Sequence, residues 1–348
     1  MDINNKYNLD LEINVEDKKI GKNNPCFIIA EAGISHFGDL KKAYQLVDLA
    51  CEAKADAVKF QIFDVDHLIS DDLLEWKERL GPRQLPYKDF EKIKNYCKSK
   101  NIIFFATAHD SPSLEFLINL NVPIYKIGSG ELGNWQFIRK IASLQKPVIL
   151  STGMYKDSEI KLAVDQFNLE KNSKLAILHC VTNYPASPSE IYIKQMHAIN
   201  KKFNCITGYS DHTEGYHIPL AAVALGSKII EKHITLDYNI PNAQDWKVSC
   251  GPENFHTFVK QVRDVEEILK QKEIEINKSE LKSKHWATKS IVAGRNIKKG
   301  EFLSDEMISF MRPGNGIPPD KTETLLGKKV LINIPKNKML KYEYFKSE

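Results

Sequence analysis

The sequence has no apolar run that approaches the ~20 residues needed to cross a bilayer. Its first 21 residues, MDINNKYNLDLEINVEDKKIG, are polar and lack the apolar segment of a secretion signal. The six cysteines stand singly, with no CxxC pair, which favours free thiols in a reducing compartment. These absences predict a cytoplasmic protein that does not have a membrane as its partner.

A stripe of basic residues is missing as well. The 49 Lys and Arg residues and the 45 Asp and Glu residues alternate along the chain and leave a net charge of only +4. A nucleic-acid-binding surface would gather its Lys and Arg on one face, so nucleic acid is not expected as a partner. A hydrophobic content of 42% with 27% charged residues is typical of a globular protein with a large core.

What the chain does contain is a series of eight short apolar runs, most of them followed by a stretch with helical periodicity. The runs are 27–33, 57–63, 102–110, 124–131, 147–154, 175–184, 204–212 and 228–235. Eight strand–helix units within about 270 residues match the count and size of a closed (β/α)8 TIM barrel. In that fold the active site lies at the carboxyl ends of the strands.

The regions flanking the barrel have a different composition. Residues 1–25 form an N-terminal lead-in that could fold as a hairpin under the barrel, which itself is expected over 26–270. Residues 271–288 are highly charged and are expected to be a linker, in part helical. Residues 289–348 carry short β-like pieces punctuated by Gly and Pro, so we expect a compact β-rich domain there.

Polar side chains stand at the end of each apolar run and are expected to converge on one pocket. They are Glu31, Lys59, Gln61, Thr107, Lys126, Ser129, Glu131, Ser151, Tyr184, Ser210, His212 and His233. The two histidines follow consecutive strands, which are ~4.8 Å apart in a sheet, so their imidazoles could share one divalent ion. The alternative is that both only satisfy hydrogen bonds in loops.

The two lysines point to an anion site. Lys59 and Lys126 each lie inside an apolar run, where an ammonium group needs an anionic partner or must reach the strand end. The neighbouring hydroxyl residues and the Gly turns at 128–130 and 151–153 would complete a cradle for a phosphate and a carboxylate. The alternative places both lysines on the outer face of the barrel. Residue chemistry alone therefore predicts metal-assisted chemistry on a phosphorylated or carboxylated small molecule.

Seven motifs in order carry a more specific signal. EAGISHFGD, DAVKFQ, YKIGSGEL, STGM, LHCVTNYP, GYSDHT and EKHITLD resemble those of the sialic acid synthase family. AGRNIKKGE and RPGNGIPP, which follow the linker, resemble the antifreeze-like (SAF) domain that this family carries at its C-terminus. The family condenses phosphoenolpyruvate with an N-acetylmannosamine-type aldehyde to give a nine-carbon 2-keto acid and phosphate.

The resemblance also implies roles for individual residues. His212 and His233 would bind Mn2+, or Mg2+ or Co2+ in its place. Phosphoenolpyruvate would be held by Lys59, Thr107, Lys126, Ser129, Ser151 and Ser210. The acetylated hexose would contact Glu31, Gln61, Tyr184 and Asp245, and the catalytic groups would be Lys126, Glu31 and Glu131, the last as acid or base at the sugar carbonyl. Arg312 would reach the barrel of a second subunit, which implies a domain-swapped homodimer.

The acceptor sugar is left open by one departure from the family pattern. In LDYNIPNAQDWKVSCGP (236–252), Asp245-Trp246 replaces the usual Asp-His, and Trp246 could stack on a sugar or only pack. Legionaminate or pseudaminate synthases, which use diacetamido-trideoxy hexoses, therefore stay alternatives to an N-acetylneuraminate synthase. A phosphorylated acceptor would need a further basic cluster, and the strand ends provide none. A non-catalytic carbohydrate-binding barrel is the remaining alternative.

Overall fold

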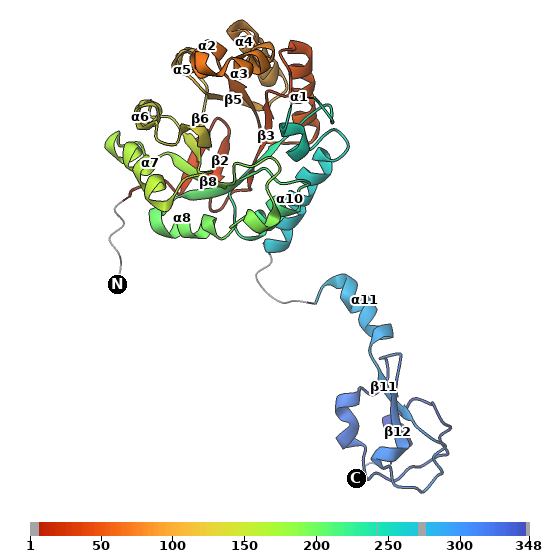
Figure 1. The fold of residues 1–348 in the computed structure, drawn as a ribbon. Helices are drawn as coiled ribbons and strands as arrows, with labels where there is room; N and C mark the ends of the chain where they lie inside the picture. Colours follow the sequence, from red (N-terminus) through yellow and green to blue (C-terminus); the bar gives the residue numbers. More distant parts are fainter. Residues whose placement is uncertain (1–6, 242, 271–275, 346–348) are drawn as a thin grey trace. The chain divides into compact units, whose positions relative to one another are not determined.

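The computed structural model describes residues 7–241, 243–270 and 276–345. Eight parallel strands close into a barrel in the order β10-β3-β4-β5-β6-β7-β8-β9, with helices around the outside (Figure 1). This architecture confirms the predicted TIM barrel. The strands are β3 Phe27–Gly33, β4 Ala57–Ile62, β5 Ile103–Ala108, β6 Tyr125–Ile127, β7 Val148–Ser151, β8 Leu175–Cys180, β9 Ile206–Asp211 and β10 Ile229–His233.

Some of the helices outside the barrel begin at a residue whose side chain caps the first turn. Asp39 accepts a hydrogen bond from the Lys41 amide at 2.7 Å, and Asp110 accepts one from the Ser113 amide at 2.7 Å. Each such cap contributes about 1 kcal/mol. The outer helices are α1 Leu40–Glu52, α4 Tyr87–Ser99, α5 Ser111–Asn119, α6 Trp135–Ser143, α7 Asp157–Leu169, α8 Gln195–Phe203, α9 His217–Ala224 and α10 Phe255–Leu269. Two short helices, α2 Val65–Leu68 and α3 Leu74–Leu80, lie between β4 and α4.

The interior of the barrel is built in layers, because alternate residues of each strand point inward. The lower layers form one buried apolar cluster with contributions from seven of the eight strands, including Phe27, Phe105 and Ile229, and from Ile124 just before β6. One or two inward positions further along, the strands carry polar residues instead. The barrel is therefore a packed core at one end and a polar site at the other.

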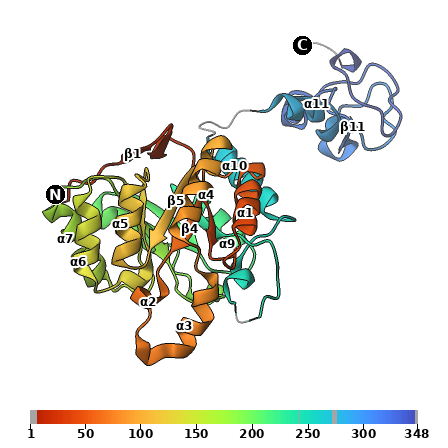
Figure 2. The same cartoon turned by 90° about the horizontal axis from the view of Figure 1, so that it is seen from above.

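An N-terminal hairpin covers the apolar end. Strands β1 Glu12–Val15 and β2 Lys18–Gly21 pair antiparallel, and Ile13, Val15 and Ile20 belong to the buried cluster of the barrel interior. In the side view, β1 lies at one end of the barrel and α2 and α3 lie at the other (Figure 2). Within the described part of the lead-in, the hairpin thus plugs the floor of the barrel.

A buried ion pair ties the ends of β9 and β10 together on the outer side of the barrel. The Lys232 ammonium group lies 2.6 Å from the Asp211 carboxylate and also donates to the Thr213 carbonyl at 2.9 Å. Both charged side chains are fully buried, with 0% of each exposed. Because Asp211 precedes His212 and Lys232 precedes His233, this pair fixes the two positions from which the histidines project.

Replacing Lys232 by Met is expected to destabilise the fold strongly. Breaking a buried pair leaves one uncompensated charge and costs about 3–5 kcal/mol. Urea unfolding followed by circular dichroism measures the change in the free energy of unfolding. Lys260→Met is the matched control, since Lys260 pairs with Asp264 on the exposed face of α10. Equal stability of the two variants would contradict the structural role of the Lys232–Asp211 pair.

The contacts divide the chain into two units, residues 1–270 and 271–348. In the second, residues 271–275 of the expected linker lie outside the described residues, and α11 Lys278–Ala287 is helical. Strands β11 Ser290–Ala293 and β12 Ile308–Met311 pair antiparallel over a small core that includes Ile291, Leu303 and Leu340. Among the residues that the structure describes, none of the helices has the length and apolar character that a membrane span requires.

Candidate active site

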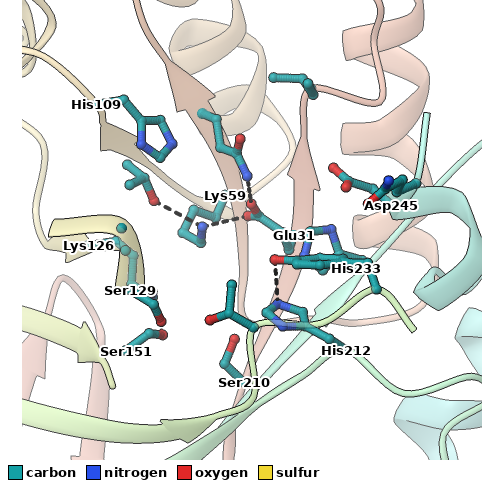
Figure 3. A pocket seen from close by; sticks show the side chains of 18 of the residues that line it. Glu31, Lys59, His109, Lys126, Ser129, Ser151, Ser210, His212, His233 and Asp245 are labelled. Atoms are coloured by element: carbon teal, nitrogen blue, oxygen red, sulfur yellow. Dashed lines mark hydrogen bonds and ion pairs between the residues drawn. The ribbon is translucent and has the colours of Figure 1, made fainter. Parts of the chain in front are cut away.

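A cavity of about 380 Å³ opens at the carboxyl ends of the barrel strands. Its size lies in the range of small-molecule sites. Twelve of the fourteen site residues predicted from the sequence line it: Glu31, Lys59, Gln61, Thr107, Lys126, Ser129, Ser151, Tyr184, Ser210, His212, His233 and Asp245. Figure 3 shows most of these side chains turned toward one another.

The register of the strands explains why residues far apart in sequence meet here. Lys59 is paired with Glu31 on β3, and Thr107 with Lys126 on β6. On the other side of the barrel, Ser210 is paired with Glu231, and His233 with Glu31. Each pair is a nearest neighbour across a parallel ladder and its members point inward. Inward-facing polar side chains of neighbouring strands are thereby brought together at the carboxyl end of the barrel.

Two lysines and two glutamates form the charged floor of the cavity. The Lys59 ammonium group lies 2.8 Å from the Glu31 carboxylate and 3.8 Å from that of Glu231. Lys126 lies 3.8 Å from Glu231, and all four side chains are at least 95% buried. Mutual pairing lets these charges exist away from water. The alternative, in which both lysines lie on the outer face of the barrel, is thus excluded.

The two glutamates have opposite pKa shifts. Burial raises the pKa of Glu31, and the nearby Lys59 does not offset it. Burial would also raise the pKa of Glu231, but Lys126 and Lys59 together outweigh it, so that the pKa is lowered. Neighbouring carboxyl groups whose pKa values are pushed apart can act as a proton donor and a permanent anion. Glu31 is therefore the group in the floor best suited to hold a proton.

Hydroxyl groups surround the lysines. Thr107 Oγ1 accepts a hydrogen bond from Lys59 at 3.0 Å, and Ser151 Oγ accepts one from Lys126 at 2.7 Å. Ser129 Oγ accepts from the Gly153 amide at 2.9 Å, and a Cβ at Gly153 would lie only 2.8 Å from that oxygen. The turn after β7 can therefore approach Ser129 only with glycine at this position. The arrangement suits a small molecule that carries more than one anionic group.

The histidine pair closes the opposite side of the cavity. The ring centres of His212 and His233 are 5.3 Å apart. His212 Nδ1 donates to the Val181 carbonyl at 2.7 Å, which leaves Nε2 to accept from the Tyr184 hydroxyl at 2.9 Å. Burial and the neighbouring His212 hold the pKa of His233 well below 6.5, so this imidazole is neutral, and its buried Nδ1 has no hydrogen-bond partner in the described chain.

The pair fits a shared metal ion in its spacing and chemistry. Two imidazoles that bind one ion at about 2.1 Å have ring centres roughly 5 Å apart. Within residues 7–241, 243–270 and 276–345, no cluster of three or more His, Cys, Asp or Glu side chains is arranged to hold an ion. A metal at this position would therefore take its other ligands from water or substrate, and it would compete with Tyr184 for His212 Nε2.

Two predicted site residues do not lie in the cavity. Glu131 is absent from the lining, because a 3₁₀ turn at Ser129–Glu131 rotates its carboxylate toward α6, where it accepts from Asn134 Nδ2 at 2.8 Å. The role predicted for Glu131, an acid or base at the reacting carbonyl, therefore stays a prediction, and in this structure its carboxylate is held outside the cavity lining. Arg312 belongs to the C-terminal unit, where its guanidinium group lies 5.5 Å from the centre of the Trp286 ring.

The segment 236–252, which departs from the family pattern, contributes a carboxylate to the cavity but no aromatic surface. Asp245 lines the cavity, whereas Trp246 does not; its Nε1 donates to the Ile240 carbonyl at 3.1 Å. The structure therefore favours packing over stacking for Trp246. Asn242 lies outside the described residues.

Several lining residues escaped the sequence analysis. Glu231 and His109 each stand two positions from a predicted site residue, His233 and Thr107, so the period of two along a strand could have identified both. Arg79 and Arg83 also line the cavity, from the segment of α3 and the turn after it. No strand-end pattern could have indicated them. These two arginines add basic groups to the cavity that the strand ends do not supply.

Comparison with known proteins gives matches over both units. The model of the NeuB family matches residues 46–274, and that of the SAF domain matches residues 288–345. The N,N'-diacetyllegionaminic acid synthase of Legionella pneumophila is 35% identical over 95% of this chain and 97% of that protein. The pseudaminic acid synthase of Campylobacter jejuni serotype O:23/36 is 33% identical over 95% of this chain and 98% of that protein.

A solved structure is similar as well. The N-acetylneuraminic acid (sialic acid) synthetase of Leptospira borgpetersenii, in complex with citrate, has a TM-score of 0.72 and 37% sequence identity. The match covers 78% of this chain and 94% of that chain.

Proposed function

The chain belongs to the NeuB family, and from this premise we propose that it condenses phosphoenolpyruvate with an N-acetylmannosamine-type aldehyde sugar. The products are a nine-carbon sialic acid, N-acetylneuraminate or a close nonulosonate, and phosphate. The single observation that carries the proposal is the buried floor of Lys59, Lys126, Glu31 and Glu231 within a ring of hydroxyls. A substrate with a carboxylate and a phosphate matches the two ammonium groups and their hydroxyl neighbours.

The reaction forms one carbon–carbon bond and breaks one carbon–oxygen bond. The enol carbon of phosphoenolpyruvate attacks the aldehyde carbon, and the carbonyl oxygen takes up a proton. Water adds to the carbon that carries the phosphate, and cleavage of the bond between that carbon and the phosphate oxygen then gives the 2-keto acid and inorganic phosphate. Lys59 and Lys126 hold the anionic groups throughout, and Glu31, whose pKa burial raises, is the proposed proton donor to the carbonyl oxygen.

The metal belongs to the proposal too. His212 and His233 would hold a divalent ion, most simply Mn2+, and burial already keeps the His233 imidazole in the neutral form that a metal ligand needs. Bound there, the ion would supply Lewis-acid polarisation of the sugar aldehyde. The Tyr184 hydroxyl, Gln61 and Asp245 line the remaining wall and would bind the hydroxyl and acetamido groups of the sugar.

A diacetamido-trideoxy hexose is the second candidate acceptor. Its support is the likeness to the legionaminic acid and pseudaminic acid synthases, which extends over 95% of this chain in both cases. A non-catalytic barrel has less support, because neither a floor lysine nor a histidine of the pair has been lost.

Phosphate release from phosphoenolpyruvate tests the proposal directly. The purified chain is incubated with Mn2+ and, in turn, N-acetylmannosamine and the two diacetamido-trideoxy hexoses, with and without chelator. We expect release that needs both a sugar and the metal. Activity with a trideoxy sugar alone would keep the reaction and change the acceptor. Release with none of the three would contradict the proposed function, and full activity under excess chelator would contradict the metal.

Arg312 is proposed to act across a domain-swapped homodimer, on the sugar bound in the partner's barrel. Arg312→Ala is then expected to raise the KM for the sugar about tenfold or more, since hydrogen bonds from charged groups contribute about 1.5–3 kcal/mol. The KM for phosphoenolpyruvate should stay unchanged. Arg295→Ala serves as a control, because Arg295 pairs with Glu301 in the same unit. Steady-state kinetics with unaltered sugar KM for Arg312→Ala would contradict the role.

A further inference from the structure

His109 lines the cavity outside the charged floor and the histidine pair. It follows β5 directly, two positions after Thr107, and its backbone amide donates to the Ile62 carbonyl at 3.1 Å. Its ring lies beside the turn after β6, since a Cβ built on Gly128 would be 3.8 Å from His109 Cε1. Figure 3 shows the imidazole on the same side of the cavity as Lys126 and Ser129. His109 is thus part of the proposed anion cradle.

One ring nitrogen of His109 has no hydrogen-bond partner within residues 7–241, 243–270 and 276–345. This nitrogen, Nε2, is buried. Buried polar atoms are nearly always hydrogen-bonded, so an exception at a cavity wall points to a ligand group as its partner. Burial, Lys59 and Lys126 lower the pKa of His109 to about 4, which makes the ring neutral before a ligand binds.

Other charges near His109 are already committed to partners. The adjacent Asp110 accepts hydrogen bonds from the amides of Asp64 and Ser113 and from the Ser113 hydroxyl. Glu31 and Glu231 are paired with the two lysines of the floor. The anionic group of a bound ligand would therefore be a negative charge near His109 that is not already paired with another residue.

We propose that His109 is a further binding residue for phosphoenolpyruvate, which takes up a proton as the ligand enters and donates a hydrogen bond to one of its anionic oxygens. The inference rests on the proposed function. The carboxylate and phosphate of the ligand reverse the local potential that Lys59 and Lys126 create. An imidazolium group also makes a shorter and stronger hydrogen bond to an anionic oxygen than a neutral ring does. Binding and proton uptake are thereby coupled.

Calorimetric titration of phosphoenolpyruvate into the intact protein tests this coupling. Titrations at pH 6.5 in two buffers with different ionisation enthalpies give the number of protons taken up. The variants are His109→Asn, which keeps a polar group, and His109→Phe, which keeps the ring shape. Because the phosphate of the ligand also titrates near pH 6, only the difference between native protein and variant counts. We expect native protein to take up more protons than either variant, and the variants to bind about 10- to 100-fold more weakly.

His179 provides the matched control. Burial lowers the pKa of His179 to about 4 as well, and its Nε2 is also buried without a partner, yet it does not line the cavity. His179→Asn should leave both the affinity and the proton uptake unchanged. In steady state, His109→Asn should raise the KM for phosphoenolpyruvate and leave the KM for the sugar as it was.

The outcomes separate this inference from the function on which it rests. If the native protein binds phosphoenolpyruvate and the His109 variants match it in affinity and proton uptake, the role of His109 is wrong and the reaction stands. A loss of the same size in His179→Asn would also overturn the role, because it would reflect a general effect of burying histidine. If the native protein neither binds nor consumes phosphoenolpyruvate, both proposals fail.

Discussion

Lys126→Met is expected to lower kcat/KM for phosphoenolpyruvate by about 100- to 1000-fold, the typical cost of removing one preorganised donor from a buried anionic site. The Lys126 ammonium group donates to Ser151 and lies 3.8 Å from Glu231. Lys59, the other cation of the floor, is paired with Glu31 and would have to leave that pair to take its place. Burial lowers the pKa of Lys126, and a bound anion would restore it. Steady-state kinetics of phosphate release provide the measurement.

The control for this variant is Lys146→Met. Lys146 precedes β7 at the opposite end of the barrel, where its ammonium group donates to Asn121 at 3.3 Å. The Lys146→Met variant should have the same activity as the native protein. If Lys126→Met keeps native kcat/KM while circular dichroism shows an intact fold, the anion cradle is placed wrongly.

A large loss of activity is also expected for His212→Ala and for His233→Ala. Either change removes one of the two imidazoles whose ring centres are 5.3 Å apart, and a single imidazole cannot hold a divalent ion in competition with water. We expect activity to fall by more than the about 10- to 100-fold that outer-sphere changes cost at metal sites. Mn2+ should raise the melting temperature of the native protein and of neither variant.

His256→Ala, on the outside of the barrel at the start of α10, controls for the loss of a histidine as such. It should keep both activity and the response to Mn2+. A His233→Ala variant that is fully active, or that Mn2+ still stabilises, would show that the two histidines do not share an ion.

The sequence predicts the barrel well because strand ends in this fold obey a simple rule. Inward-facing residues repeat every second position, and the last of them in each strand lines the site. That rule places Lys59, Lys126 and His233 correctly, and applied more strictly it would have added Glu231 and His109. The sequence analysis selected one polar residue of an apolar run and passed over a second one two positions away on the same face of the strand.

The failures arise where the chain leaves the strands. Strand β6 has only three residues, and the 3₁₀ turn that follows advances about 120° per residue. Glu131 therefore turns to Asn134 rather than to the cavity. Arg79 and Arg83 reach the cavity from α3 and the turn after it, whose position depends on tertiary packing and not on a local period. Side chains on such loops can be assigned to the cavity only from the three-dimensional structure.

Closure of the barrel limits how early in its synthesis the chain can complete its fold. The pairing that seals it joins β3 to β10, as in the register of Phe27 with Ile229, so two segments about 200 residues apart must meet. Until the later segment has been synthesised, β3 has an open edge that could pair with another chain. The cavity takes residues from both strands, so it comes into being only with the last ladder. A chain that stops before residue 229 would thus lack the cavity and would be prone to aggregate during synthesis.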